Sequence, residues 1–245
     1  MKTKPLYYRF IEFLLWVILA FMVVGGVLYE VYRNPRLHLF GDLVYRVETD
    51  QKVVALTFSD GPKPGTTQEL LSVLNREGVL GTFYLNGLPM QANPEETKLI
   101  IKKGHEVGSQ GYSHFNMGEM SYEEIAEEIE STEKVIRELG YKGELTFRPP
   151  FGKGLFTLPS YLKDNGITNV TWDVEAETFI DEEDTTEKIV ARTLEQVKPG
   201  SIILMHIMYE EHGQSMAALP IIIRKLKEQG YSFATVSELI KLGVE

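Results

Sequence analysis

The chain has 245 residues, of which 43% are hydrophobic and 24% are charged, and this balance excludes wholesale disorder. Its formal net charge of −10 argues against general nucleic-acid binding, because an acidic body repels phosphates. It has no cysteine, which excludes disulfides, thiol catalysis and cysteine-ligated metal sites.

The first element in the chain is an apolar run near the N-terminus. Residues 13–29 carry no charge, and with residues 10–11 they approach the roughly 20 residues that a membrane-spanning helix needs. Lys2, Lys4 and Arg9 precede the run, so the positive-inside rule favours a cytoplasmic N-terminus and an extracytoplasmic body. A signal peptide, cleaved near Gly25-Gly26, is the competing interpretation.

The composition divides the chain into four parts. We predict a short tail over 1–9, a transmembrane anchor over 10–29, a linker over 30–51 and one folded domain over 52–242. The expected location is therefore the cell membrane, crossed once, with the C-terminal domain outside.

Strand-like and helix-like segments alternate through the body. The predicted strands are 53–59, 82–85, 106–109, 146–148, 169–173, 201–205 and 232–235. The predicted helices are 67–77, 94–103, 121–139, 158–165, 186–196, 215–229 and 236–242. This alternation predicts an α/β fold with a parallel sheet covered by helices, either a small barrel or an open doubly wound sheet.

Polar side chains recur where the predicted strands end. Both sheet architectures place function at the carboxyl ends of their strands, so we expect these side chains to meet at one rim. Carboxylates and imidazoles are groups that hold a metal ion or perform acid–base chemistry. The strand ends carry Asp60, His114, Arg148, Glu175 and His206.

Five segments carry a recognisable pattern: TFSDGP at 57–62, GHEVGSQGYSH at 104–114, FRPPFG at 147–152, WDVE at 172–175 and LMH at 204–206. In this order they resemble the motifs of the polysaccharide deacetylases with the NodB homology domain, carbohydrate esterase family 4. The resemblance covers residues 52–240. Five ordered motifs are far more specific than any one of them.

The resemblance implies a distorted (β/α)7 barrel that uses a divalent metal (zinc, cobalt, manganese or nickel) to hydrolyse N-acetyl groups. It implies that Asp60 and His114 bind the metal, that His206 is the general acid and that Arg148 orients the base. It also implies that the backbone N–H of Phe151 is an oxyanion donor. The implied substrate is a cell-wall or surface polysaccharide of N-acetylated hexosamines.

Three positions depart from the family's pattern, and all three belong to the reaction centre. Ser59 replaces the aspartate base, and a neutral hydroxyl needs a base of its own to act near pH 7. Gln110 replaces a metal histidine, and an amide oxygen is a weaker ligand than imidazole. Thr178 replaces the aspartate that would tune the acid histidine.

These departures leave two functions open. The first is a membrane-anchored deacetylase with an impaired or rearranged site, in which Asp173, Glu175 or Glu177 supplies a missing acid or base. The alternative is a catalytically inactive glycan-binding or regulatory protein at the cell surface. The sequence gives no indication of an oligomeric state.

Overall fold

The computed structural model describes residues 5–37, 41–177, 184–208 and 213–243. Its helices are α1 (Leu6–Arg33), α2 (Thr66–Glu77), α3 (Gly87–Ala92), α4 (Pro94–Lys102), α5 (Tyr122–Glu138), α6 (Thr157–Asp164), α7 (Thr186–Gln196), α8 (Gly213–Glu228) and α9 (Val236–Leu242). Its strands are β1 (Leu43–Val44), β2 (Val53–Ser59), β3 (Thr82–Leu85), β4 (Glu106–Ser109), β5 (Asn169–Val170), β6 (Val174–Glu175), β7 (Ile202–Met205) and β8 (Ser232–Ala234).

The strands form a distorted barrel. The main sheet has the order β4-β3-β2-β7-β6, β8 pairs with the start of β2, and every ladder is parallel. Phe147 makes bridges to Ser109 and to Asn169, and this links β4 to β5. The segment 169–175 therefore contacts Phe147 at its start and β7 at its end, which closes the ring. The predicted α/β barrel-like class is confirmed.

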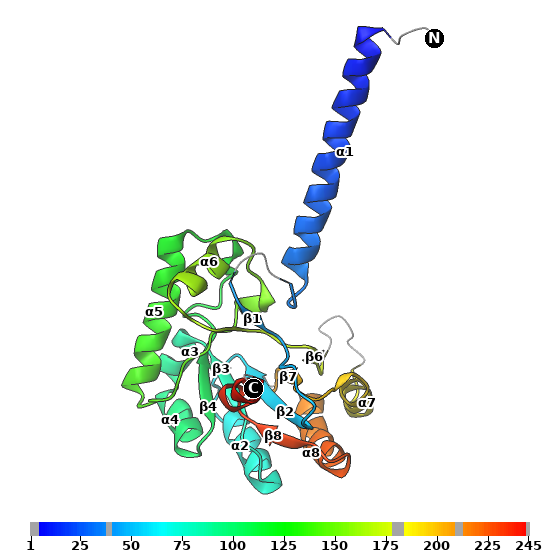
Figure 1. Ribbon diagram of the computed structural model, residues 1–245. Helices are drawn as coiled ribbons and strands as arrows, with labels where there is room; N and C mark the ends of the chain where they lie inside the picture. Colours follow the sequence, from blue (N-terminus) through cyan, green and yellow to red (C-terminus); the bar gives the residue numbers. More distant parts are fainter. Residues whose placement is uncertain (1–4, 38–40, 178–183, 209–212, 244–245) are drawn as a thin grey trace.

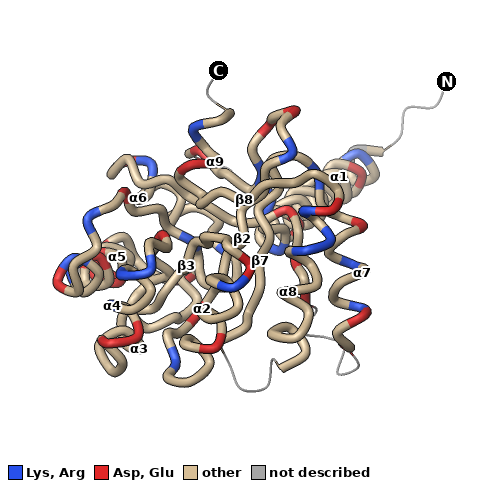
Figure 2. Tube along the Cα trace, turned by 90° about the horizontal axis from the view of Figure 1, so that it is seen from below, with Lys and Arg blue, Asp and Glu red and all other residues tan. Residues whose placement is uncertain are grey.

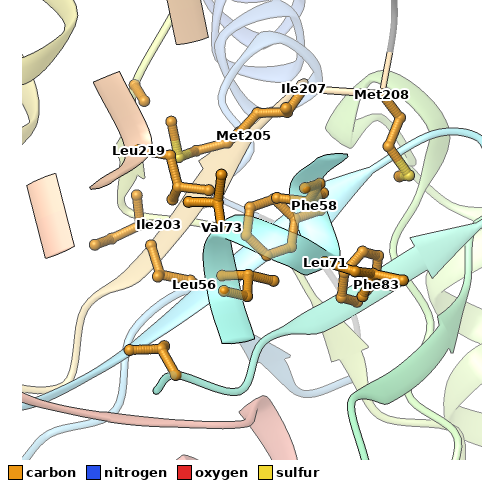
Figure 3. Packing of buried hydrophobic residues seen from close by; sticks show 14 of the residues in the cluster. Leu56, Phe58, Leu71, Val73, Phe83, Ile203, Met205, Ile207, Met208 and Leu219 are labelled. Atoms are coloured by element: carbon orange, nitrogen blue, oxygen red, sulfur yellow. The ribbon is translucent and has the colours of Figure 1, made fainter. Parts of the chain in front are cut away.

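The two faces of the strands pack against different neighbours. Leu56 and Phe58 of β2 lie among side chains of α2 and α8, between the sheet and its outer helices (Figure 3), and Val54 belongs to the same buried cluster. Ala55 belongs to a second buried cluster, in the barrel interior, with side chains from β3, β7 and α9. This alternation follows from the period of two along a strand. It turns Thr57 and Ser59 of β2 to the interior side.

The helices that wrap the barrel are amphipathic. In α5, Ile125, Ile129 and Ile136 are buried, and α5 begins with a capping box between Ser121 and Glu124. Charged residues gather on the outer helices and connecting loops, and the central strands carry few of them (Figure 2). The acidic character of the body therefore belongs to its outer surface.

The observed elements differ from the predicted ones in three places. The predicted strand 169–173 is replaced by β5 (Asn169–Val170) and β6 (Val174–Glu175), because this segment pairs with β1 at its start and with β7 at its end. The predicted strand 146–148 is reduced to the two bridges of Phe147, because two prolines follow it and end its pairing. The short helix α3, which contains Pro89, had no periodic pattern that could predict it.

The N-terminal helix leaves the body directly (Figure 1). Within the described residues it is the one helix long and apolar enough to cross a membrane, with mean hydropathy 2.5 and no buried part in that window. It is longer than the predicted anchor and ends at Arg33. The segment predicted as a linker is partly built into the body, because β1 pairs with β5 and Val47 is buried.

Candidate functional site

A cleft of about 300 Å³ lies at the carboxyl ends of the barrel strands. Its lining residues come from all five sequence motifs: Ser59, Asp60, Gln110, His114, Pro149, Phe151, Trp172, Glu175 and His206. The structure thus brings together most of the residues that the sequence selected. The parallel arrangement of the strands explains this convergence, since all carboxyl ends reach one rim.

Three residues of the cleft hold unusual backbone conformations. Asp60, His114 and Phe151 have φ angles of 71°, 62° and 58°, and they are the non-glycine residues with positive φ in the described part of the chain. Such conformations cost roughly 1–3 kcal/mol each and persist where the surroundings enforce them. Their concentration in one cleft indicates that this site is organised for function.

Asp60 and His114 form the centre of the cleft. Asp60 Oδ1 is buried, lies 3.1 Å from His114 Nε2 and accepts no well-aligned hydrogen bond within the described residues. Burial alone would raise the pKa of Asp60, but the contact with His114 and the charges of His206 and Arg148 outweigh it and lower the pKa. Asp60 is therefore ionised at neutral pH and turned toward His114.

Gln110 lies beside this pair, but its amide oxygen points toward the backbone. The backbone N–H of Asp60 donates to Gln110 Oε1 at 3.0 Å, and Gln110 Nε2 lies 3.3 Å from His114 Nε2. The amide oxygen, which is the only metal-binding atom of this side chain, thus faces the backbone. The amide nitrogen faces the imidazole.

Arg148 is fully buried inside the barrel and contacts Ser59. Its Nη1 donates to Thr57 Oγ1 at 2.9 Å and to Ser59 Oγ at 3.2 Å, while Nη2 donates to the Thr171 carbonyl at 3.0 Å. Its Cζ lies 4.0 Å from the centre of the Tyr84 ring. Burial lowers the pKa of Arg148 to about 10, so it stays charged at neutral pH. The guanidinium that the resemblance assigns to a base carboxylate therefore contacts hydroxyls instead.

Glu177 contacts His206 just after β7. The backbone N–H of His206 donates to both carboxylate oxygens of Glu177, at 3.1 and 3.2 Å, and His206 Nδ1 lies 3.6 Å from Glu177 Oε2. The carboxylate therefore holds the backbone of His206 and lies beside its imidazole. Thr178, the departing position of the fourth motif, lies outside the described residues.

The other two candidate carboxylates, Glu175 and Asp173, lie in different surroundings. Glu175 lines the cleft, and burial raises its pKa while the nearby charge of His206 opposes the shift. Asp173 is not among the lining residues. Its oxygens accept hydrogen bonds from the Ser201 hydroxyl and the Ile202 N–H, both at 2.8 Å, so the structure assigns it to the start of β7.

Phe151 forms the open side of the cleft. Its ring centre lies 4.9 Å from that of His114, and 57% of the residue is exposed. Together with Trp172 it offers an aromatic surface, which suits the apolar face of a sugar ring. The role of its backbone N–H as an oxyanion donor stays a prediction.

Glu128 on α5 is a site residue that the sequence analysis missed. Its carboxylate accepts hydrogen bonds from the Tyr112 N–H at 2.7 Å and the Ser113 N–H at 2.9 Å, and from the Ser113 hydroxyl at 2.7 Å. These bonds fix the segment that leads into His114. Nothing in the sequence separates this glutamate from the other glutamates of the same helix, because the contact exists only in the fold.

The cleft residues fit only part of the metal site that the resemblance implies. Two ligands bound to one ion at about 2.0–2.2 Å lie roughly 3 Å apart, which the orphaned Asp60 Oδ1 and His114 Nε2 satisfy at 3.1 Å. Catalytic zinc sites use three protein ligands, and Gln110 does not turn its oxygen to this pair. The described part of the chain holds no cluster of three His, Cys, Asp or Glu side chains suited to a metal. The three-ligand site is therefore incomplete.

The chain is similar to known cell-wall deacetylases. The polysaccharide deacetylase family model matches residues 46–170. A peptidoglycan-N-acetylglucosamine deacetylase of Bacillus cereus is 33% identical over 201 residues, which cover 82% of this chain and 94% of that protein. The peptidoglycan-N-acetylmuramic acid deacetylase PdaC of Bacillus subtilis is 37% identical over 79% of this chain, but the match spans only 40% of PdaC.

Solved structures share the fold. The Bc1960 peptidoglycan N-acetylglucosamine deacetylase superimposes with a TM-score of 0.76 at 29% identity, covering 81% of this chain and 92% of that one. BA3943 from Bacillus anthracis, described as a CE4 family pseudoenzyme, gives a TM-score of 0.72 at 28% identity over 83% of this chain and 70% of its own. A BA3943 mutant described as having restored enzymatic activity gives 0.75 at 29% identity, over 83% of this chain and 73% of its own. The motifs, the barrel and these matches agree, and the chain belongs to the polysaccharide deacetylase family.

Proposed function

We propose that this chain is a membrane-anchored, glycan-binding member of the polysaccharide deacetylase family in which N-acetyl hydrolysis is strongly impaired. The observation that carries the proposal is the contact between Arg148 and Ser59. At the position where the family has its base carboxylate, the buried guanidinium meets a hydroxyl. A hydroxyl cannot take up a proton at neutral pH as a carboxylate base does.

The incomplete metal site supports the same conclusion. Both the base and the third metal ligand are missing. Gln110 accepts a hydrogen bond from the backbone N–H of Asp60, and Ser59 accepts one from Arg148. Loss of a general base alone costs on the order of 10²–10⁴ in rate. His206 is present and has the carboxylate of Glu177 beside it, so the acid side of the centre is the better preserved half.

The shape of the cleft supports glycan binding. Phe151 and Trp172 give it an aromatic wall, and Asp60, His114 and Glu175 provide polar groups for sugar hydroxyl and amide groups. The relatives named above act on N-acetylglucosamine or N-acetylmuramic acid of peptidoglycan. We therefore propose a polysaccharide of N-acetylated hexosamines as the ligand.

Helix α1 supports an attachment to the membrane. Its uncharged stretch and its full exposure suit a single transmembrane span. The basic residues before it favour a body on the outer face of the membrane, where the glycans of the cell envelope lie.

A second candidate is slow deacetylation with a substitute base, and Glu175 favours it. This carboxylate lines the cleft and has a pKa raised by burial, as general acid–base groups often do. In that case Glu175→Gln would abolish the remaining turnover, whereas a pure binding protein would show none to abolish.

The test uses the full chain in detergent with N-acetylglucosamine oligomers and with peptidoglycan, in the presence of Zn²⁺, Co²⁺, Mn²⁺ or Ni²⁺. We expect glycan binding by calorimetry and acetate release no faster than that of a His206→Ala control. The double variant Ser59→Asp/Gln110→His is expected to release acetate at least tenfold faster, because it supplies the base and the third ligand. Acetate release by the unmodified chain well above the His206→Ala control would contradict the proposal, and so would a failure to bind any glycan.

A further inference from the structure

The end of helix α1 contacts the loops that border the cleft. Tyr32, in the last turn of α1, accepts a hydrogen bond on its hydroxyl from Asn116 Nδ2 at 3.0 Å. The ammonium of Lys153 lies 5.2 Å from the centre of the Tyr32 ring. Asn116 follows His114 by two residues, and Lys153 follows Phe151 by two. The end of α1 thus contacts both loops that form one wall of the cleft.

The chain just after α1 continues this contact. The Thr171 hydroxyl donates to the Pro35 carbonyl at 2.6 Å, and the Arg36 guanidinium donates to the Asp173 carbonyl. A side pocket at the end of α1 is lined by residues 33–36 and shares Trp172 and Glu175 with the cleft. The helix end is therefore attached to the rim of the site by hydrogen bonds of Tyr32, Pro35 and Arg36, and α1 extends away from the body (Figure 1).

The length of α1 places this attachment at the membrane surface. The uncharged residues 13–29 span about 26 Å as a helix, close to the roughly 30 Å of a hydrocarbon core. The outer edge of that core then falls near Tyr29, and Tyr32 lies about 4–5 Å farther along the axis. The headgroup layer is roughly 5–8 Å thick, so Tyr32 and the residues that touch it lie at headgroup depth.

The two loops carry side chains suited to that depth. Phe115, which precedes Asn116, is 69% exposed, and Phe156, three residues after Lys153 in the second loop, is 47% exposed. Phenylalanine is among the apolar residues that interfacial membrane-binding segments bury at the boundary between headgroups and acyl chains. Lys153, Arg33 and Arg36 add positive charge here, in a body that is acidic as a whole, and positive charge suits anionic headgroups.

We propose that the loops 113–118 and 151–156 rest in the outer headgroup layer of the membrane that α1 spans, with Phe115 and Phe156 inserted at the interface. The inference rests on the membrane anchor of the proposed function but not on glycan binding or turnover. It assigns the lipid bilayer as the partner of this aromatic face. It also means that the cleft opens at the lipid surface, where it meets glycan that is held close to the membrane.

The absence of cysteine makes a direct test simple, because a single introduced cysteine carries the only label. The full chain is reconstituted into vesicles of phosphatidylcholine and phosphatidylglycerol, with a nitroxide at Phe115→Cys or Phe156→Cys. Leu80→Cys is the matched control, since Leu80 is an exposed apolar residue just before β3, at the amino ends of the strands. Leu19→Cys, within the uncharged stretch of α1, reports on the anchor itself.

We expect the ratio of oxygen to water-soluble nickel accessibility at positions 115 and 156 to exceed that at position 80 several-fold. The inference would be overturned if the labels at 115 and 156 were as accessible to nickel as the label at 80 while the label at 19 lay in lipid. That result would still support the membrane anchor. A water-accessible label at 19 would overturn both.

A second measurement uses the unmodified chain, in case a labelled variant does not fold. Vesicles that contain a phospholipid with a photoreactive headgroup are irradiated, and the crosslinked peptides are identified by mass spectrometry. Crosslinks are expected in 113–118 and 151–156 and not in the peptide that contains Leu80. Equal labelling of all three peptides, or labelling of none, would overturn the proposal.

Discussion

Arg148 is the residue around which the interior of the site is arranged. It is fully buried, its donors reach hydroxyl and carbonyl oxygens, and the Tyr84 ring stacks on it at 4.0 Å. A buried charge needs such compensation because its desolvation costs several kcal/mol. In this chain hydroxyls, carbonyls and ring faces provide the compensation that an aspartate at position 59 would provide in the family's pattern.

Substitutions at Ser59 test this account. Ser59→Ala removes one acceptor from a buried charged donor, and we expect the free energy of unfolding to fall by about 1–3 kcal/mol. Ser59→Asp places a carboxylate beside the guanidinium, and we expect it to be clearly more stable than Ser59→Ala. Urea unfolding of both variants at neutral pH provides the measurement, and an alanine variant as stable as the unmodified chain would refute it.

The burial of His105 predicts that the stability of the fold depends on pH. It is buried, its Nδ1 accepts a hydrogen bond from the Gly81 N–H at 3.2 Å, and burial lowers its pKa from 6.5 to about 4. The unfolded chain therefore binds a proton near pH 6.5 and the folded chain only near pH 4. The contribution of this neutral histidine is complete above pH 6.5 and is lost as the pH falls toward 4, by about 3 kcal/mol in total.

His105→Gln keeps an acceptor for Gly81 but cannot take up a proton. We expect the free energy of unfolding of this variant to depend less on pH across that window than that of the unmodified chain. Denaturant titrations at several pH values within the window measure the difference. Two parallel pH profiles would show that His105 does not titrate as its burial implies.

The structure brings the residues of the sequence motifs together, although the sequence did not predict the hydrogen-bond partners of several of them. Four of the predicted site residues occupy motif positions. Three of them line the cleft, namely Asp60, His114 and His206, and the fourth, Arg148, lies in the barrel interior and contacts Ser59. The orientation of Gln110 toward a backbone N–H and the place of Asp173 at β7 depend on neighbours distant in sequence. Patterns within a motif contain no information on such contacts, so the structure was needed to assign them.

At the scale of elements, periodic segments with capping residues were predicted well and aperiodic ones were not. Helices α7 and α9 have the predicted bounds, because a complete apolar stripe and capping residues mark them. Helix α3 has six residues and no stripe, and the pairing around Phe147 depends on strands far away in the chain. The barrel closure itself follows from these distant pairings, which is why the sequence left an open sheet as an alternative.

Helix α5 has a positioning task in addition to its packing, and Glu128 tests it. Glu128→Ala removes the acceptor of two backbone N–H groups and one hydroxyl. We expect the free energy of unfolding to fall by about 1–3 kcal/mol, and amide exchange in residues 111–116 to become faster than in the rest of the body. Glu127→Ala, at an exposed neighbouring position, is the matched control and should change neither quantity.

Equal exchange in the two variants would mean that the loop before His114 keeps its conformation without Glu128. Faster exchange throughout the body of Glu128→Ala would instead show a general loss of stability. Only a change confined to residues 111–116 supports the positioning role.

At the scale of the whole molecule, the intact N-terminus distinguishes an anchor from a cleaved signal. We expect the chain produced in a Gram-positive host to stay in the membrane fraction after alkaline washing, because α1 contains the long uncharged stretch 13–29. Intact-mass measurement should give a chain that retains residues 10–29. A soluble product that begins after Gly25-Gly26 would show that the segment is a signal peptide instead.

The contacts between the end of α1 and the body limit how far the body can move relative to α1. A domain on a long flexible tether sweeps a volume whose depth grows with the tether. Here Tyr32 is hydrogen-bonded to the body, and Pro35 and Arg36 are bonded to it as well. If α1 spans the membrane as proposed, the body moves with it by lateral diffusion in two dimensions, and its reach above the lipid is set by its own height. The junction would then set how far from the lipid a glycan strand can lie and still meet the cleft.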